Sequence, residues 1–281
     1  MSPEDLAAEV DQLTSFPDIA YRISDLLDDE HSSAWDIGAL IEQDPALTSA
    51  LLRLANSAFY NSGVPVNVID RAVTVVGARE VRDLTFGICT KNAFEDLDAH
   101  GAALTEFWSH SLRCAATART VADSLSIRNR DSLFMAGLLH DIGKLAMLCQ
   151  CKDQSLEVTR LMESESVKQD TIAAERHVFG FDHTDVGAAL MELWKLPSYL
   201  REVSKHHHLP EDDEKSNQTV DIVHVADRLT VLMETKPSDS LVPLRIAPQA
   251  QQRLKLETET MPTIAANAQA LVTELTQILA A

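Results

Sequence analysis

Apolar residues recur along most of the chain at the three- and four-residue spacing that is typical of one buried face of an α-helix. Ile19, Ile23 and Leu26 form an early stripe of this kind, and the tail 264–278 carries the same period. No segment shows the strict alternation of a strand, and no internal repeat is visible. The pattern therefore predicts an all-α fold. The other periodic ranges are 6–13, 47–54, 73–88, 105–125, 131–149, 154–178, 182–194, 197–207 and 219–234.

Several residues mark where these helices begin or end. Asp44 followed by Pro45 is a start signal, because Asp caps a helix N-terminus and Pro suits the first helical position. Gly77 separates two predicted helices, and Gly143 marks an expected interruption of a later one. Asn56 is interpreted as a left-handed cap at a helix C-terminus. The segments 61–65, 205–217 and 236–248 are predicted loops.

The chain divides by its motifs into three predicted parts. Residues 1–95 form an N-terminal helical part, residues 96–235 form a larger part that carries most of the histidines, and residues 236–281 form a C-terminal helical appendage. No Pro-, Gly- or Ser-rich linker separates the first two parts, so we expect them to share one core.

Composition supports the helical interpretation, and the net charge restricts the classes of molecule that the protein could bind. Of 281 residues 45% are apolar and only 5% aromatic, with nine Gly, which favours helices over a many-stranded sheet. The net charge of −19 disfavours nucleic-acid polymers and anionic membranes as partners. The stretch 133–149 is too polar to span a membrane, and the N-terminus lacks the features of a secretion signal. We expect a cytoplasmic protein.

Four cysteines in a chain of this length do not make a disulfide framework. Cys149 and Cys151 form a Cys-x-Cys pair that could hold a metal ion, but no second pair lies at ligand spacing. They are interpreted as reduced thiols.

The string Gly137-Leu-Leu-His140-Asp141-Ile-Gly143-Lys144 is the most informative segment. A single His-Asp pair is most often structural. Here other metal-competent side chains follow in order, each at a predicted helix end or on an apolar face: His110, His183, His206, His207 and Asp227. Imidazole and carboxylate together suit divalent transition metals. Two such ions sharing a carboxylate would lower the pKa of a bound water and hold a phosphoryl group.

This order of residues resembles the HD superfamily of metal-dependent phosphohydrolases, and more specifically the HDOD family (HD-related output domain) of bacterial signalling proteins. The resemblance covers about residues 10–235. Its remaining motifs are Phe16-Pro17, Asp44-Pro45-Ala46-Leu47, Leu51-Leu52-Arg53-Leu54-Ala55-Asn56-Ser57-Ala58, Gly180-x-x-His183-x-x-x-Gly187 and Trp194-x-Leu196-Pro197.

The resemblance implies an HD-type helical fold with an N-terminal helical subdomain packed on it. It also implies one or two divalent ions, with Fe, Mn, Zn, Ni and Mg all left open. Asp141 would bridge the ions and, with Lys144 as a phosphate contact, take part in catalysis. Which two of the three consecutive histidines 206–208 bind metal stays open, and His224 is assigned to packing or support. By the same resemblance, the basic site would comprise His110, His140, Asp141 and Asp227, the second metal would be held by His183, His206 and His207, and Glu106 would be an additional carboxylate.

Two functions follow from the resemblance. The first is a metal-dependent phosphohydrolase in bacterial signalling, whose substrate is a phosphorylated small molecule or nucleotide. The second is a non-catalytic regulatory module that binds a signalling partner protein or a small signal, because many HDOD domains have lost metal ligands. No Gly-Tyr-Pro signature follows the paired histidines, and the acidic run Glu211–Glu214 would repel a dianion. Hydrolysis of cyclic di-GMP is therefore disfavoured.

Overall fold

The computed structural model describes residues 1–14, 17–57, 60, 63–95, 101–127, 132–163, 171–208, 217–234 and 245–279. Every regular element within these ranges is a helix, and no strand occurs in them, which confirms the prediction of an all-α fold. None of the helices in the described parts of the chain combines the length and the apolar character that crossing a bilayer requires.

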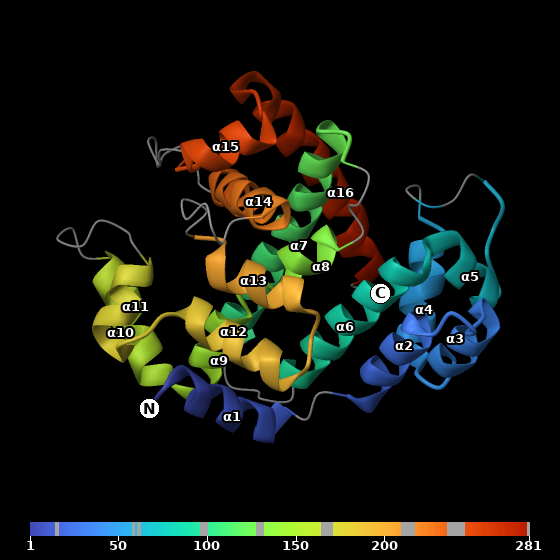
Figure 1. Ribbon diagram of the computed structural model, residues 1–281, viewed down its shortest axis with the longest axis horizontal. Coiled ribbons are helices and arrows are strands. Elements are labelled where there is room, and N and C mark those ends of the chain that lie inside the picture. Colours follow the sequence, from blue (N-terminus) through green and yellow to red (C-terminus); the bar gives the residue numbers. More distant parts are fainter. Residues whose placement is uncertain are drawn as a thin grey trace.

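The order of the helices along the chain is shown by the labels and colours of Figure 1. In the first third of the chain they are α1 (Pro3–Thr14), α2 (Asp18–Asp28), α3 (Ala34–Ile41), α4 (Pro45–Ala55), α5 (Ile69–Val76) and α6 (Ala78–Glu95). The middle of the chain forms α7 (Gly101–Ser124), α8 (Leu133–Leu139), α9 (Ile142–Gln150), α10 (Lys152–Glu163), α11 (Thr171–Phe179), α12 (His183–Leu193) and α13 (Ser198–His206). The remainder forms α14 (Gln218–Glu234), α15 (Pro248–Leu254), the 3-10 turn η1 (Thr258–Thr260) and α16 (Met261–Leu279).

The buried apolar side chains form two clusters. One cluster fills the space between α2, α3, α4 and α5, and the C-terminal helix α16 contributes Val272 and Leu275 to it. The other surrounds α7, α8, α12 and α14 and includes Leu6 and Val10 of α1. Helix α1 therefore packs on α9 and α12, away from α2–α5, as Figure 1 shows at the bottom of the view. The division of the chain at residue 95 stays a prediction.

The predicted start of α4 is confirmed, and the interpretation of its end is corrected. The Asp44 carboxylate accepts hydrogen bonds from the backbone N–H groups of Ala46 and Leu47, with Pro45 at the first helical position. Asn56 caps the C-terminus in a right-handed conformation (φ −96°) and not in the predicted left-handed one. Its side-chain amide bonds both backbone groups of Val66, at 2.7 and 2.8 Å, so this side chain fixes the loop that follows.

The helix predicted over 131–149 is interrupted at His140–Asp141 and not at Gly143. Gly143 lies inside α9, where its missing side chain allows close packing. A Cβ atom at this position would collide with the backbone of His183 and Gly187 in α12. The glycine therefore brings α9 against α12 and places Asp141 next to His183.

One further expectation is corrected, and two others concern residues that the structure does not describe. The range 154–178 contains two helices, α10 and α11, and not one. The acidic run Glu211–Glu214 and most of the predicted loop 236–248 lie outside the described residues. None of the four cysteines forms a disulfide bond in the structure, and neither Cys149 nor Cys151 belongs to a metal-capable group among the described residues.

Candidate metal centre

Histidines and aspartates from several helices converge on one place in the larger cluster. His110 comes from the middle of α7 and Asp227 from the middle of α14. His140 and Asp141 occupy the break between α8 and α9, where the chain leaves one helix and enters the next. His183 is the first residue of α12, where Asp182 caps the helix and fixes where it starts. The last contributors, His207 and His208, follow directly on α13.

The Asp141 carboxylate lies at the centre of this arrangement, and its two oxygens face different histidines. Oδ2 lies 3.3 Å from His140 Nε2 and 3.8 Å from His110 Nε2. Oδ1 lies 3.1 Å from His183 Nε2 and 3.3 Å from His207 Nε2. Asp227 Oδ1 is 3.3 Å from His110 Nε2, on the Oδ2 side of Asp141. Two metal-capable groups result, and they consist of His110, His140 and Asp227, and of Asp141, His183, His207 and His208.

The other ring nitrogen of each central histidine is held by a hydrogen bond. His140 Nδ1–H donates to the Gly137 carbonyl at 2.8 Å, and His207 Nδ1–H donates to the Ser204 carbonyl at 3.0 Å. His183 Nδ1 and His110 Nδ1 bond the carboxylates of Glu175 at 2.6 Å and Glu234 at 3.0 Å. Such outer bonds fix the tautomer and direct the Nε2 lone pair toward a metal.

Burial shows that these residues fit divalent ions. His140, His183 and His207 are fully buried, and Asp141 is 1% exposed. His140 Nε2, His207 Nε2 and Asp141 Oδ1 make no hydrogen bond although each atom is inaccessible to solvent. Leaving buried polar atoms without partners is costly, and a shared cation would satisfy all three. Imidazole nitrogen with carboxylate oxygen is a donor set for Fe, Mn, Zn or Ni.

The protonation states follow from the same burial and charge. Burial opposes a charge on His140, but the Asp141 carboxylate outweighs it and raises the pKa of His140 well above its usual value. Burial likewise disfavours the charged form of Asp141, yet His140 and Lys144 hold its pKa well below the usual range. Burial lowers the pKa of His207 to about 4, so its ring is neutral at physiological pH and offers a lone pair.

The structure gathers His207 and His208 into the centre but not His206. Neighbouring helical residues point about 100° apart, so three consecutive histidines at a helix end cannot all face one point. The His206 ring turns along its own helix, with Nε2 3.8 Å from the Glu202 carboxylate. The prediction that His206 is a metal ligand therefore finds no support in the geometry.

His208 lies at the position that the sequence interpretation gave to His206. It is less well prepared to bind a metal than His207. Arg228 donates a hydrogen bond to His208 Nδ1 at 2.6 Å. A neutral ring that accepts at Nδ1 carries its proton on Nε2, the atom that faces His183 Nε2 at 3.1 Å. His208 must exchange that proton or turn its ring before it can bind a metal, whereas His207 need not.

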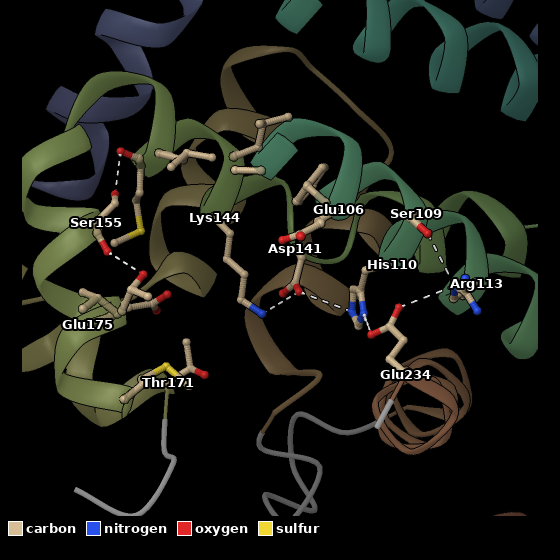
Figure 2. Close-up of a pocket in the computed structure, with 18 of the residues that line it drawn as sticks. Glu106, Ser109, His110, Arg113, Asp141, Lys144, Ser155, Thr171, Glu175 and Glu234 are labelled. Carbon is tan, nitrogen blue, oxygen red and sulfur yellow. Dashed lines mark hydrogen bonds and ion pairs between the residues drawn. The ribbon is translucent and has the colours of Figure 1, made fainter. Parts of the chain in front are cut away.

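A cavity of about 830 Å³ opens beside the histidines (Figure 2). The remaining predicted site residues, Lys144 and Glu106, line it. Lys144 donates to Asp141 Oδ2 at 2.6 Å, and its side chain is 33% exposed. Glu106 lines the cavity from the same face of α7 as His110, but it belongs to neither metal-capable group. Figure 2 shows Lys144 and His110 approaching Asp141 from opposite sides, with Glu234 and Arg113 beyond His110.

Several residues that support the centre were missed by sequence reasoning. Glu175, Glu234 and Arg228 orient His183, His110 and His208, yet no spacing in the sequence links them to those histidines. His224 was expected to support or pack. It donates to the His207 carbonyl at 2.7 Å and accepts from the backbone of Ala247 at 2.9 Å.

Comparison with known proteins gives a family and a fold. The family model described as HDOD domain matches residues 13–210, a range that ends before α14 and therefore before Asp227. An HDOD domain protein with unknown function from Geobacter sulfurreducens has a solved structure that is 27% identical, with a TM-score of 0.76 over 98% of this chain and 96% of that one.

Two more distant relatives complete the comparison. A protein from Shewanella amazonensis SB2B, provisionally described as a phosphohydrolase, matches with a TM-score of 0.75 at 21% identity over 98% of this chain and 97% of its own. At that identity the likeness concerns the fold alone. An uncharacterized protein of Treponema pallidum (strain Nichols) is 23% identical over 268 residues, or 91% of this chain. The match covers 50% of that relative, so the chain spans about half of its length.

Proposed function

The chain belongs to the HDOD family, and from that premise we propose that it is a metal-dependent phosphohydrolase acting on a phosphorylated small molecule or nucleotide in bacterial signalling. The observation that carries the proposal is the position of Asp141, whose two carboxylate oxygens face two separate sets of histidines. Divalent ions held there would supply an activated water and neutralise the charge of a phosphoryl group. His110, His140, Asp141 and Asp227 would hold one ion, and Asp141, His183 and His207 the other.

The residues of the cavity suit a phosphate ester. Lys144 is a half-buried ammonium at the edge of the metal centre, and its position allows it to move from Asp141 to a phosphate oxygen. Met147, Val158 and Phe179 line the far part of the cavity and offer an apolar surface to the remainder of a substrate. The volume of about 830 Å³ lies in the range of small-molecule sites.

The metal requirement is tested first. Protein purified without a histidine tag, under aerobic and anaerobic conditions, is analysed for bound metal and titrated with Mn²⁺ and Fe²⁺. We expect His207→Ala to lower metal affinity by at least about 100-fold, because removing a ligand exceeds the 10- to 100-fold effect of removing its support. His206→Ala is the matched control, since this neighbouring histidine lies outside the centre, and it should bind metal as the unchanged protein does.

The activity is tested with metal-loaded protein on 4-nitrophenyl phosphate, bis(4-nitrophenyl) phosphate and a panel of nucleotides. Turnover that His207→Ala removes and His206→Ala keeps supports the proposal. A protein that binds metal tightly and hydrolyses none of these esters contradicts it and favours the non-catalytic regulatory module. A protein that takes up no metal under either condition excludes the metal centre itself.

A further inference from the structure

A second cavity of about 520 Å³ lies on another face of α7, between α6, α8 and α16. His110 faces the metal centre, whereas Trp108 and Leu112 line this second cavity. Residues two apart on a helix point about 200° apart, so α7 forms a wall of both cavities. The second cavity also meets the N-terminal helices, since Leu54 of α4 and Leu84 of α6 line it.

The walls of the second cavity are predominantly apolar. They are built from side chains that leave a space far larger than a water molecule, although protein interiors are normally packed without such voids. Small-molecule sites in proteins have this volume and this kind of lining. The apolar wall residues are Leu84, Ile88, Leu112, Phe134, Leu138, Leu271 and Leu275.

Several buried polar atoms of the lining residues make no hydrogen bond, and three of them belong to side chains that argue for a ligand. They are Trp108 Nε1, which can only donate, the Ser57 hydroxyl oxygen, and Glu274 Oε1, which as a carboxylate oxygen accepts. They come from α7, from the residues that follow α4, and from α16. Buried polar groups normally have partners, so these atoms offer hydrogen-bonding positions to a molecule in this space.

Charged side chains of both signs line the second cavity, and they are Glu80, Asp83, Lys91, Arg113, Arg119 and Glu274. Arg119 donates to the Tyr60 hydroxyl at 2.9 Å and lies 3.7 Å from the Glu80 carboxylate. Burial raises the pKa of Tyr60 to about 12, so the phenol stays uncharged. These contacts compensate the charge of Arg119, whereas Glu274 offers a buried carboxylate oxygen that makes no hydrogen bond. The acceptor at Glu274 therefore suits a ligand that carries a hydrogen-bond donor.

We propose that this second cavity binds a small amphipathic molecule, uncharged or singly positive, with an apolar body and an N–H donor. The apolar body would lie against Leu84, Ile88 and Phe134, and the N–H group would bond Glu274. An acceptor on the same molecule would take the Trp108 indole N–H. The proposal does not rest on the phosphohydrolase activity, since none of the metal-capable residues lines this second cavity.

N-phenyl-1-naphthylamine, an uncharged aromatic amine with one N–H donor, is a suitable probe because its fluorescence increases in apolar sites. Titration of the full chain should give saturable binding at one site. Trp108 lines the cavity, so its emission should transfer to the bound probe. Trp108→Phe should remove most of this transfer, while Trp35→Phe, at an exposed residue, should keep it.

Matched variants locate the probe. Ile88→Trp fills the second cavity and should lower affinity at least about tenfold, whereas Val158→Trp fills the metal-centre cavity and should leave affinity unchanged. Glu274→Gln keeps the shape of the side chain and should weaken binding about tenfold, as loss of a charged acceptor predicts. Glu106→Gln, which removes a carboxylate from the other cavity, is its control.

The outcomes decide the proposal in either direction. Absence of saturable binding to the unchanged protein overturns it and leaves water as the occupant. Loss of binding in Val158→Trp with retention in Ile88→Trp also overturns it, because the probe then occupies the metal-centre cavity. If Ile88→Trp fails to fold by circular dichroism, the energy transfer and the pair Glu274→Gln and Glu106→Gln carry the decision.

Discussion

The two cavities on either side of α7 differ in what fills them and in how visible they are in the sequence. One is centred on Asp141 and several histidines whose order along the chain forms a motif. The other is lined by leucine, isoleucine and phenylalanine, which in the sequence cannot be told from core residues. The difference teaches that polar residues on apolar helix faces reveal a site, whereas an apolar site becomes visible only once the helices are placed.

The cavities also differ in how they would hold a ligand. In the metal centre, a hydrogen bond at the other ring nitrogen holds each central histidine in place, as it does for His140 and His183. Electrostatics dominates there, and a change of one charge has a large effect. In the second cavity apolar contact area dominates, with a few hydrogen bonds for orientation. Changes at one site should therefore leave the other largely unaffected, and this independence can be tested.

The largest expected effect is that of Asp141→Asn. The variant keeps the shape of the side chain but removes the charge that faces both sets of histidines, so metal affinity should fall by at least about 100-fold and turnover by about 1,000-fold or more. Metal analysis and hydrolysis of 4-nitrophenyl phosphate measure these effects. N-phenyl-1-naphthylamine should bind as before. A simultaneous loss of probe binding in a folded variant would show that the two cavities are not independent.

Lys144→Met should separate catalysis from metal binding. The substitution removes an ammonium that donates to Asp141 Oδ2, and a metal competes with that ammonium for the same oxygen. Metal content should therefore be kept, while turnover should fall about 100-fold because a charge-assisted contact to the phosphate is lost. Parallel measurements of metal content and of kcat test this. Unchanged turnover would remove Lys144 from the catalytic residues.

A smaller effect is expected for Glu234→Gln. Glu234 orients His110 through a 3.0 Å hydrogen bond, and removal of such a partner typically costs about 10-fold or more in metal affinity. Glu106→Gln is the control, because this second carboxylate of the same cavity belongs to neither metal-capable group. If both variants lose metal affinity to the same extent, Glu106 contributes to the metal site, as the family resemblance implies.

The smallest expected effect is a pH dependence of stability. In the metal-free protein the raised pKa of His140 stabilises the fold below about pH 6.5, its usual unfolded value, and this contribution is lost as the pH rises through the raised pKa. The lowered pKa values of Asp141 and Asp227 contribute above about pH 3.9 and are lost as the pH falls further.

Metal binding requires deprotonated imidazoles, so it strengthens as the pH rises. The difference in Tm between Mn²⁺-loaded and metal-free protein should therefore widen between pH 6 and pH 8, as measured by differential scanning fluorimetry. Stabilisation by N-phenyl-1-naphthylamine should stay constant over that interval. A metal-induced Tm difference that narrows with pH would contradict the assigned protonation of His140.

The sequence predicted the fold and most of the centre for identifiable reasons. Helical periodicity located α4, α7, α12 and α14, and the order of His and Asp residues along the chain predicted most members of the metal-capable groups. The break at Asp141 was placed at Gly143 because glycine commonly ends helices, whereas here it allows α9 to approach α12.

Other features depend on distances between helices that no local pattern encodes. The choice between His206 and His208 depends on where α13 ends, and a shift of one residue turns a side chain by about 100°. Glu175 and Glu234 reach their histidines across the fold, so their roles required the assembled structure. The second cavity depends on how α6 and α16 lie against α7.

Arg113 of α7 lines both cavities. Its guanidinium bonds Gln269 of α16 at 3.3 Å and lies 3.7 Å from Glu234, the carboxylate that holds His110. An occupant of the second cavity that displaces this side chain would therefore change the support of a metal ligand. Thermodynamic linkage makes such an effect reciprocal, so metal loading would change the affinity for that occupant by the same factor. A ligand that leaves Arg113 in place keeps the two cavities independent, and Arg113 is thus the side chain whose displacement would couple them.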